Sequence, residues 1–320
     1  MDRLQAMRTF VRVVESGSFS AVAREFRSTQ SAISKQVAAL ERALGVRLLA
    51  RTTRSLALTE QGQRYFEQAR RLVGEIAELE TSVRSGERQL TGLLRVATSV
   101  GYGRLRLLPL VREFLALHPA VRVDLKLQDG FVDLVEQGID VAVRIGELGD
   151  SSLVARRVGA TRRVLVAHRS YLRGLGRTRK APRQPEELLD HNCIVYTELA
   201  SVNAWTFIAG QGAARPAGTT VTVRVQGNLQ TNSSEVIRAS LLEGMGVGYA
   251  PLWMFEEEVA SGVVQVLLPD WHTKPVPIHL VSPRERWQAS KVQAFAGHVA
   301  AALGAQPSVL RRDGAGAPGQ

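Results

Sequence analysis

The sequence has little cysteine, and this scarcity excludes two kinds of site. Cys193 is the single cysteine in 320 residues, so the chain cannot form an intramolecular disulfide, a two-cysteine redox switch or a cysteine-rich metal centre. The six histidines lack the close spacing of metal ligands. We therefore expect no metal and no cofactor, and we interpret Cys193, in the apolar run CIVY, as an inert buried thiol.

Long apolar runs and catalytic motifs are also missing. No stretch approaches the ~20 apolar residues of a membrane span. The N-terminal MDRLQAMRTF lacks the apolar segment of a signal peptide behind its arginines. The chain contains no G-x-S-x-G elbow, no P-loop and no H-E-x-x-H motif. These absences predict a cytoplasmic protein that does not contact a membrane and is not an enzyme.

The charge balance favours an anionic partner. Lysine and arginine total 41 against 30 acidic residues, which gives a net charge of +11. Nucleic acid is a better candidate for this anionic partner than a membrane, because the sequence has no isolated, strongly basic amphipathic stretch that would bind a membrane surface. A content of 45% hydrophobic and 22% charged residues is that of a globular chain, and the length leaves room for two or three domains.

Three short helices are predicted before residue 45. The first covers residues 3–15 and ends at Gly17, Ser18 caps the second, and after a turn Thr29 caps the third. The third helix has an apolar face at helical spacing, made of Ile33, Val37, Leu40 and Leu44. Its opposite face carries short or polar side chains that suit a DNA major groove, namely Gln30, Ser31, Ser34, Lys35 and Ala38. An ordinary amphipathic surface helix is the alternative for this segment alone.

A basic wing is predicted behind the third helix. Two short apolar strands flank a tip at residues 51–55. Arg51 and Arg54 would reach phosphates or the minor groove, and Thr52 would donate a hydrogen bond to a phosphate oxygen. A solvated charged loop is the alternative, but the position directly after the helix favours DNA. We assign residues 1–58 to a winged helix-turn-helix domain.

The segments SFSAVARE, TQSAISKQVAALE and LGVRLLARTTRSLALTEQG resemble the N-terminal domain of LysR-type transcriptional regulators. The resemblance implies DNA contact by Gln30, Ser31, Ser34, Lys35, Arg51, Thr52 and Arg54, and we add Thr29, which caps the third helix, to the predicted DNA-binding set. Ser31 stands where proline is frequent, and Lys35 stands where arginine is frequent. Lysine lacks the bidentate fork of arginine, so contact of Lys35 with phosphate is favoured over contact with guanine.

A long linker helix, capped by Thr59, is predicted from Thr59 to about Gly86, within an assigned segment of residues 59–88. It would be roughly 40 Å long and keeps an apolar seam that the small N-terminal domain cannot cover. The resemblance implies antiparallel pairing of this helix in a homodimer or homotetramer, and therefore a double-stranded operator that is an interrupted palindrome. Packing on the chain's own second domain is the alternative.

Strands and helices alternate after a polar hinge at residues 85–92, which predicts an α/β effector domain over residues 89–303. The predicted strands are LLRVAT, VRVDLKL, IDVAVRI, RRVLVAH, CIVY, VGYAP and VPIHLV, and the predicted helices are residues 104–117, 187–190, 233–243 and 288–302. We expect two lobes, the first at about 92–161 and 268–303 and the second at about 162–267. Residues 304–320, rich in Gly, Ala and Pro, are predicted to be a disordered tail.

The segments LPLVREFLALHP, VDLVEQGIDVAVRIGELGDSSLVARRVGATRRVLVA and EVIRASLLEGMGVGYAP resemble the effector domain of the same regulators. The resemblance implies a fold like that of type 2 periplasmic binding proteins, with two Rossmann-like lobes joined by strands that cross near residues 160–168 and 262–268. It also implies a small-molecule effector, for which a carboxylate is one candidate class.

Six residues are candidate effector contacts because they lie where strands end and helices begin, and free backbone N–H groups attract anions there. They are Thr98, Ser99, Arg144, Thr231, Asn232 and Ser233. Helix capping is the alternative for the hydroxyl and amide side chains, and pairing with a nearby acid is the alternative for Arg144. The glycines of EGMGVG follow a helix and precede a strand, so they predict a helix end and turn and not a phosphate site.

The sequence thus predicts a sequence-specific DNA-binding transcriptional regulator controlled by an effector bound between two lobes. RNA polymerase is a further candidate partner. A solute-binding protein and an architectural DNA-binding protein are the alternatives, but the first needs no DNA-binding module and the second needs no large α/β domain.

Overall fold

The structure is a computed structural model that describes residues 2–51, 56–85, 90–149, 151–176 and 180–305. The chain divides into two compact units. The first runs through Leu93 and takes in Ala120–Arg122, and the second holds Leu94–Pro119 and the chain from Val123 onward. No helix within the described ranges is long and apolar enough to span a membrane.

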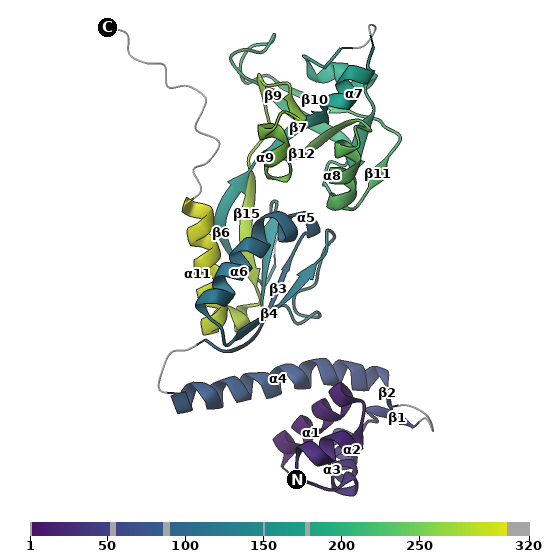
Figure 1. Cartoon of the computed structure of the whole chain (residues 1–320), viewed down its shortest axis with the longest axis vertical. Helices are drawn as coiled ribbons and strands as arrows, with labels where there is room; N and C mark the ends of the chain where they lie inside the picture. Colours follow the sequence, from purple (N-terminus) through teal and green to yellow (C-terminus); the bar gives the residue numbers. More distant parts are fainter. Residues whose placement is uncertain (1, 52–55, 86–89, 150, 177–179, 306–320) are drawn as a thin grey trace, which may run out of the picture. The chain divides into compact units, whose positions relative to one another are not determined.

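The first unit has the predicted order of three helices, a β-hairpin and a long helix (Figure 1). Three of the predicted caps are confirmed: Ser18 accepts from the Ala21 N–H at 3.2 Å, Thr29 from Ala32 at 3.2 Å, and Thr59 from Gly62 at 2.9 Å. The elements are α1 (Arg3–Ser16), α2 (Phe19–Glu25), α3 (Gln30–Leu44), β1 (Leu49–Arg51), β2 (Leu56–Leu58) and α4 (Glu60–Ser85).

Phe10 of α1 lies at the centre of the core of this unit and is fully buried. Its ring lies 5.7 Å from that of Tyr65 and 6.4 Å from that of Phe66, both on α4. The start of the long helix therefore packs on the small domain. Glu41 fastens α3 to the hairpin, because its carboxylate accepts from the backbone N–H groups of Leu48 at 2.8 Å and Leu49 at 3.1 Å.

The first lobe of the second unit is a five-stranded sheet in the order β4-β3-β5-β15-β6, with α6 and α11 packed beside each other on it (Figure 1). Phe114 and Phe295 join these two helices edge to face at 5.2 Å. The elements of the lobe are β3 (Gly92–Thr98), α5 (Val100–Tyr102), the π-helical turn η1 (Gly103–Leu107), α6 (Leu108–Leu117), β4 (Val121–Leu127), β5 (Val141–Ile145), β6 (Val154–Thr161), β15 (Val276–Ser282), α10 (Arg284–Trp287) and α11 (Ser290–Ala305).

The second lobe has a five-stranded sheet in the order β11-β8-β12-β7-β13 and a three-stranded sheet in the order β10-β9-β14. Cys193 is buried in β8, and burial raises the pKa of its thiol to about 12. The elements are β7 (Arg163–His168), α7 (Arg169–Gly174), η2 (Pro185–Asp190), β8 (Cys193–Tyr196), β9 (Ala204–Ala209), β10 (Thr220–Arg224), β11 (Gln230–Thr231), α8 (Ser234–Leu242), β12 (Val247–Pro251), η3 (Leu252–Met254), α9 (Glu256–Ala260), β13 (Val264–Leu267) and β14 (Trp271–His272).

The chain crosses between the lobes twice. The first crossing, at Arg162 between β6 and β7, falls in the predicted range, but the second differs from the prediction of residues 262–268. There, β13 pairs with β7 and β14 pairs with β9, so both strands belong to the second lobe and the crossing comes at residues 273–275. An apolar run indicates a strand, but it does not indicate which sheet supplies the pairing partner.

Two helix boundaries also differ from the prediction. The helix expected at residues 104–117 begins at Val100 and includes the π-helical turn η1, and the last helix runs to Ala305. The predicted tail therefore starts at least two residues too early, and residues 306–320 lie outside the described part of the chain. The glycines of EGMGVG do form a helix end and turn, where Gly244 has a left-handed φ of 71°.

Gly62 and Gly74 of α4 offer a matched test of how the long helix packs. A Cβ at Gly62 would lie 1.9 Å from the Leu48 carbonyl oxygen, whereas a Cβ at Gly74 would meet nothing within 4 Å. We expect Gly62→Ala to lower the free energy of unfolding by about 1 to 3 kcal/mol, and Gly74→Ala to raise it by about 0.5 to 1 kcal/mol through helix propensity. Urea unfolding of both variants measures these changes, and equal effects at the two positions would contradict the close approach of α4 to the backbone of Leu48.

Candidate functional site

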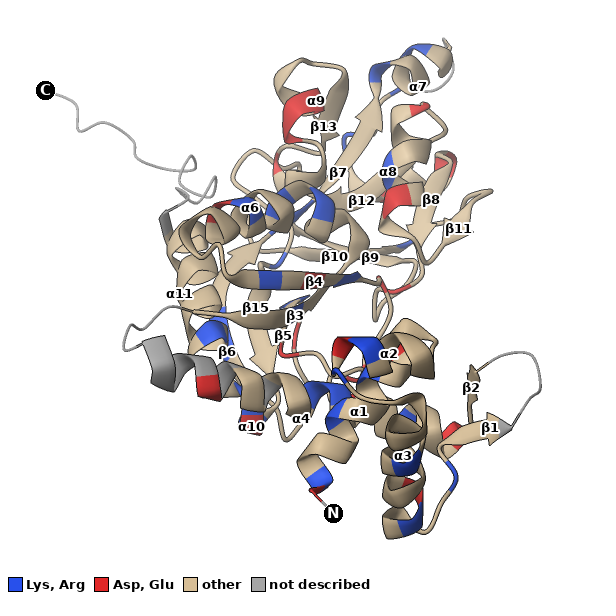
Figure 2. Cartoon of the chain, turned by 60° about the horizontal axis from the view of Figure 1, so that its bottom comes forward, with Lys and Arg blue, Asp and Glu red and all other residues tan. Residues whose placement is uncertain are grey.

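The exposed face of α3 is the first candidate site. Ile33, Val37 and Leu40 are buried in the core of the first unit. The opposite face is exposed and carries the predicted set Gln30, Ser31, Ser34, Lys35 and Ala38. Figure 2 shows basic residues on α3. This face therefore combines short side chains, an amide and a cation on a single exposed helix, as major-groove recognition requires.

Side chains of α1 and α2 hold α3 in position. Thr9 donates to the Gln36 side-chain oxygen at 2.7 Å, and Ser20 donates to that of Gln30 at 3.0 Å. The bond from Ser20 fixes the orientation of the Gln30 amide, whose nitrogen is the donor group. Arg12 of α1 binds Glu25 of α2 through two hydrogen bonds of 2.9 Å and thereby lowers the pKa of Glu25.

The wing is only partly described. Arg51 ends β1 and pairs with Leu56 of β2, so the predicted hairpin is confirmed. The side chain of Arg51, together with Thr52 and Arg54, lies outside the described residues. The DNA contacts assigned to these three residues therefore stay predictions.

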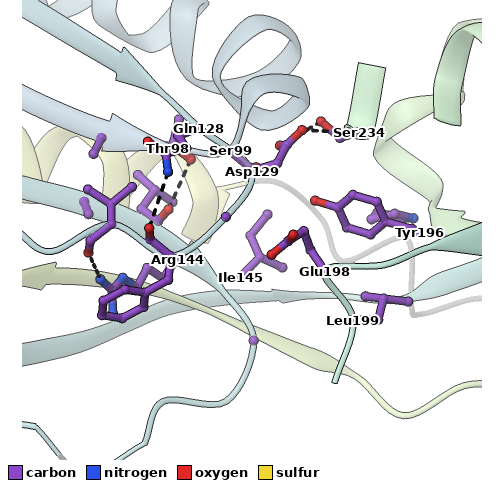
Figure 3. A pocket seen from close by; sticks show the side chains of 18 of the residues that line it. Thr98, Ser99, Gln128, Asp129, Arg144, Ile145, Tyr196, Glu198, Leu199 and Ser234 are labelled. Atoms are coloured by element: carbon purple, nitrogen blue, oxygen red, sulfur yellow. Dashed lines mark hydrogen bonds between the residues drawn. The ribbon is translucent and has the colours of Figure 1, made fainter. Parts of the chain in front are cut away.

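A cavity of about 460 Å³ between the two lobes of the second unit is the second candidate site. The ends of β3, β4 and β5 supply one wall, and β7, β8, β12 and α8 supply the other. Figure 3 shows Tyr196 and Glu198 pointing from the second lobe toward the side where Ile145 of the first lobe lies. A concave space of this size, with an apolar wall and a few polar groups, suits a small molecule.

The structure brings three of the six candidate contacts to this cavity. Thr98, Ser99 and Arg144 line it, whereas Thr231, Asn232 and Ser233 are not among its lining residues. Thr231 accepts from the Ser233 N–H at 3.1 Å, and Ser233 caps α8 by accepting from Val236 at 3.4 Å. The capping alternative therefore accounts for the contacts of Thr231 and Ser233, and the next residue, Ser234, reaches the cavity instead.

Arg144 is held in place by a carbonyl and not by an acid. Its guanidinium donates to the Val132 carbonyl at 2.8 Å and lies 5.1 Å from the centre of the Phe131 ring. Burial lowers the pKa of Arg144, and Asp133 partly opposes that shift. Thr98 is also engaged within its lobe, because its hydroxyl donates to the Val143 carbonyl at 3.1 Å.

Asp129, which the sequence analysis missed, joins the two lobes at the edge of the cavity. Its carboxylate accepts from the Val100 N–H of the first lobe at 2.9 Å, and from the N–H and the hydroxyl of Ser234 in the second lobe at 2.6 and 2.9 Å (Figure 3). The Ser234 hydroxyl also accepts from the Gly101 N–H at 3.0 Å. We call these four residues the interlobe clasp. The Asp-Gly pair after a strand was the only local signal for it.

Two ion pairs continue the contact between the lobes. Arg104 binds Glu235 at 3.1 Å, and Arg106 binds Glu256 at 2.8 Å. Both arginines come from the π-helical turn η1, and both acids come from the second lobe. Because all four side chains are partly exposed, each pair contributes little on its own. The hydrogen bonds of the clasp are part-buried or buried and three of them involve a carboxylate, so they are the stronger link.

Comparison with known proteins decides the family. Residues 4–63 match the bacterial regulatory helix-turn-helix family of LysR proteins, and residues 87–304 match the LysR substrate binding domain. The chain belongs to the LysR family of transcriptional regulators. The predicted family, fold class and function are thereby confirmed: the N-terminal domain binds DNA, and the two-lobed domain binds an effector.

Relatives and solved structures agree over nearly the whole chain. The transcriptional regulator CrgA of Neisseria meningitidis is 32% identical over 94% of this chain and 97% of its own length, and the transcriptional activator AaeR of Escherichia coli is 33% identical over 92% and 91%. The structure of CrgA matches with a TM-score of 0.60 over 94% of this chain and 98% of that chain. The full-length structure of AphB, a virulence activator of Vibrio cholerae, is 27% identical and matches with a TM-score of 0.55 over 92% and 98%.

Replacing Asp129 in this LysR-family regulator tests the interlobe clasp. An asparagine cannot accept all the bonds that the carboxylate accepts, so we expect Asp129→Asn to lower the free energy of unfolding by about 1.5 to 3 kcal/mol. Glu198→Gln is the control, because it removes a charge from the same cavity without removing a hydrogen bond between described residues. Thermal unfolding of both variants measures this loss. An unchanged stability of Asp129→Asn would show that the clasp contributes nothing to the free energy of unfolding.

Proposed function

We propose that this LysR-family regulator is a homodimer or homotetramer that binds an interrupted palindrome, with Thr29, Gln30, Ser31, Ser34 and Lys35 at the DNA. The exposed, short-chained face of α3 is the observation that carries this proposal. Pairing of α4 between subunits is supported by its 26 residues and by Leu72, which is 40% exposed on it. Two paired copies would place two recognition helices at half-sites about one DNA turn, or a multiple of it, apart.

We infer that the effector is an organic anion with a carboxylate group. Arg144 and Arg163 both line the cavity, and burial lowers the pKa of each. An anion would offset the cost of burying these charges. Effector binding would change the angle between the lobes and thus the spacing of the recognition helices on DNA.

The remaining expectations follow from membership of a DNA-binding family. We place the protein in the cytoplasm, where the bacterial chromosome lies, and we assign it no catalytic role because the sequence holds none of the catalytic motifs sought. RNA polymerase is the partner through which a bound regulator would act. The experiment below tests the proposed form of the operator.

Selection of bound fragments from the source genome, followed by footprinting at increasing salt, tests the proposed function. We expect an interrupted palindrome upstream of a gene, protected over two half-sites. Protection of a single undivided site, or protection that is independent of sequence, would overturn the proposed interrupted palindrome.

Two single substitutions separate base recognition from backbone contact. Ser34→Ala on α3 is expected to relax discrimination at one base position, because the residue faces the groove. Arg54→Ala in the wing, predicted from the sequence, is expected to weaken binding to all sequences and to lower the slope of log K against log salt by about one unit. Binding titrations on operator and scrambled DNA measure both, and equal loss of specificity from the two variants would refute the assignment.

A further inference from the structure

A second cavity, of about 720 Å³, lies in the second unit beside the two crossings between its lobes. Arg162 and Thr273, one from each crossing, both line it. Its lining differs from that of the effector cavity described above, because among the described residues only Arg163 and Trp253 line both. The second cavity is therefore a separate candidate site, for which the proposed effector does not account.

Three buried donor atoms around the second cavity have no hydrogen-bond partner among the described residues: the Tyr102 hydroxyl, the Trp253 Nε1 and the Arg162 Nε. Tyr102 is 1% exposed, and burial raises its pKa to about 12, so its hydroxyl keeps its proton at neutral pH. Buried polar groups nearly always have a partner. Three unpaired donors at one cavity therefore indicate that something with acceptor atoms binds there.

The three residues lie close together. The rings of Tyr102 and Trp253 meet edge to face, with their centroids 5.2 Å apart. The backbone carbonyl of Arg162 accepts from the N–H of Leu252, the residue before Trp253, at 3.3 Å. We therefore expect one ligand group with two or three acceptor atoms to reach more than one of these donors.

The charge of the lining favours an anion. Arg106, Arg162 and Arg163 line the second cavity, and Glu256 is the single acidic residue among its described lining residues. Glu256 is paired with Arg106 at 2.8 Å, so the other two arginines have no acidic partner in the cavity. An oxyanion supplies both the negative charge and the acceptor atoms that the three donors lack.

The rest of the wall is mostly aliphatic. It includes Val158, Leu165, Leu268, Ile278 and Leu303. Burial of apolar surface against such a wall is favourable and non-directional, so the wall suits a flexible alkyl chain. The volume of the cavity leaves room for a chain of several carbons beyond the head group.

We propose that the second cavity binds an amphiphilic organic anion, with its oxyanion head at Tyr102, Arg162 and Trp253 and its alkyl chain along the aliphatic wall. This site is additional to the effector cavity and does not depend on the effector or the operator proposed above. Because Arg162 and Thr273 belong to the two crossings, the ligand contacts the segments where a change in lobe angle must occur. It would therefore act as a second input on that angle.

Isothermal titration of the full-length protein tests the site. The probes are octanoate, octyl phosphate, hexanoate and 1-octanol, each below the concentration at which it forms micelles or separates from solution. Tyr102→Phe and Arg162→Gln each remove one of the unpaired donors. Tyr196→Phe is the matched control for the first variant, because Tyr196 lines only the effector cavity. Arg157→Gln is the control for the second, because Arg157 is exposed and lines neither cavity.

We expect octanoate or octyl phosphate to bind the wild type more tightly than 1-octanol does, and the tighter of the two anions identifies the head group. Octanoate should bind about tenfold more tightly than hexanoate, the effect of burying two more methylene groups. Tyr102→Phe and Arg162→Gln should each weaken binding of the anion by about tenfold or more, the effect of one hydrogen bond to a charged group. The two control variants should bind it as the wild type does.

Three results would overturn the proposal: no binding of either eight-carbon anion, equally tight binding of 1-octanol, or a loss in Tyr196→Phe as large as that in Tyr102→Phe. The first would leave ordered water as the partner of the three donors, and the last would assign the anion to the effector cavity. Tyr102→Phe keeps the test valid if Arg162→Gln does not fold, because the Tyr102 hydroxyl has no hydrogen bond to lose within the described chain.

Discussion

The hydrogen bonds of the Asp129 carboxylate are the interaction on which the arrangement of the effector domain depends. The chain crosses between the two lobes by two short segments, and these covalent connections alone do not fix the angle between the lobes. Asp129 accepts from backbone groups of both lobes at 2.6 to 2.9 Å, and charge-assisted bonds of this length are about twice as strong as neutral ones. The clasp therefore sets the geometry of the cavity beside it, and it makes the lobe angle sensitive to anything that competes for those donors.

The DNA-binding unit depends on a different principle, which is close packing around Phe10. Rings from α4 meet Phe10, and Glu41 holds α3 to the hairpin through two backbone bonds. A recognition surface needs a fixed helix because a small displacement would misplace every base contact. The buried side of α3 supplies this rigidity and leaves its other side free to vary in sequence. The same helix thus serves stability on one face and recognition on the other.

The effector cavity shows where prediction from sequence reached its limit. Thr98 and Ser99 were predicted at the cavity and line it, because the end of a strand and the start of a helix are visible in the local pattern. Ser233 and Ser234 are both small hydroxyl residues at the same helix start, and nothing local distinguishes the cap from the residue that faces the cavity. Asp129 resembles any Asp-Gly turn until its partner, 105 residues away in the sequence, is known.

The sequence by itself determined the element order, the caps of α2, α3 and α4, the buried and exposed faces of α3, and the division into a DNA-binding unit and an α/β domain. These features depend on hydrophobic period, capping residues and turns, which act over a few neighbouring residues. Only the tertiary structure decided that β14 belongs to the second lobe, that Asp129 joins the lobes, and that Ser234 and not Ser233 reaches the cavity. Such outcomes depend on which distant groups meet after folding, and local periodicity does not encode those pairings.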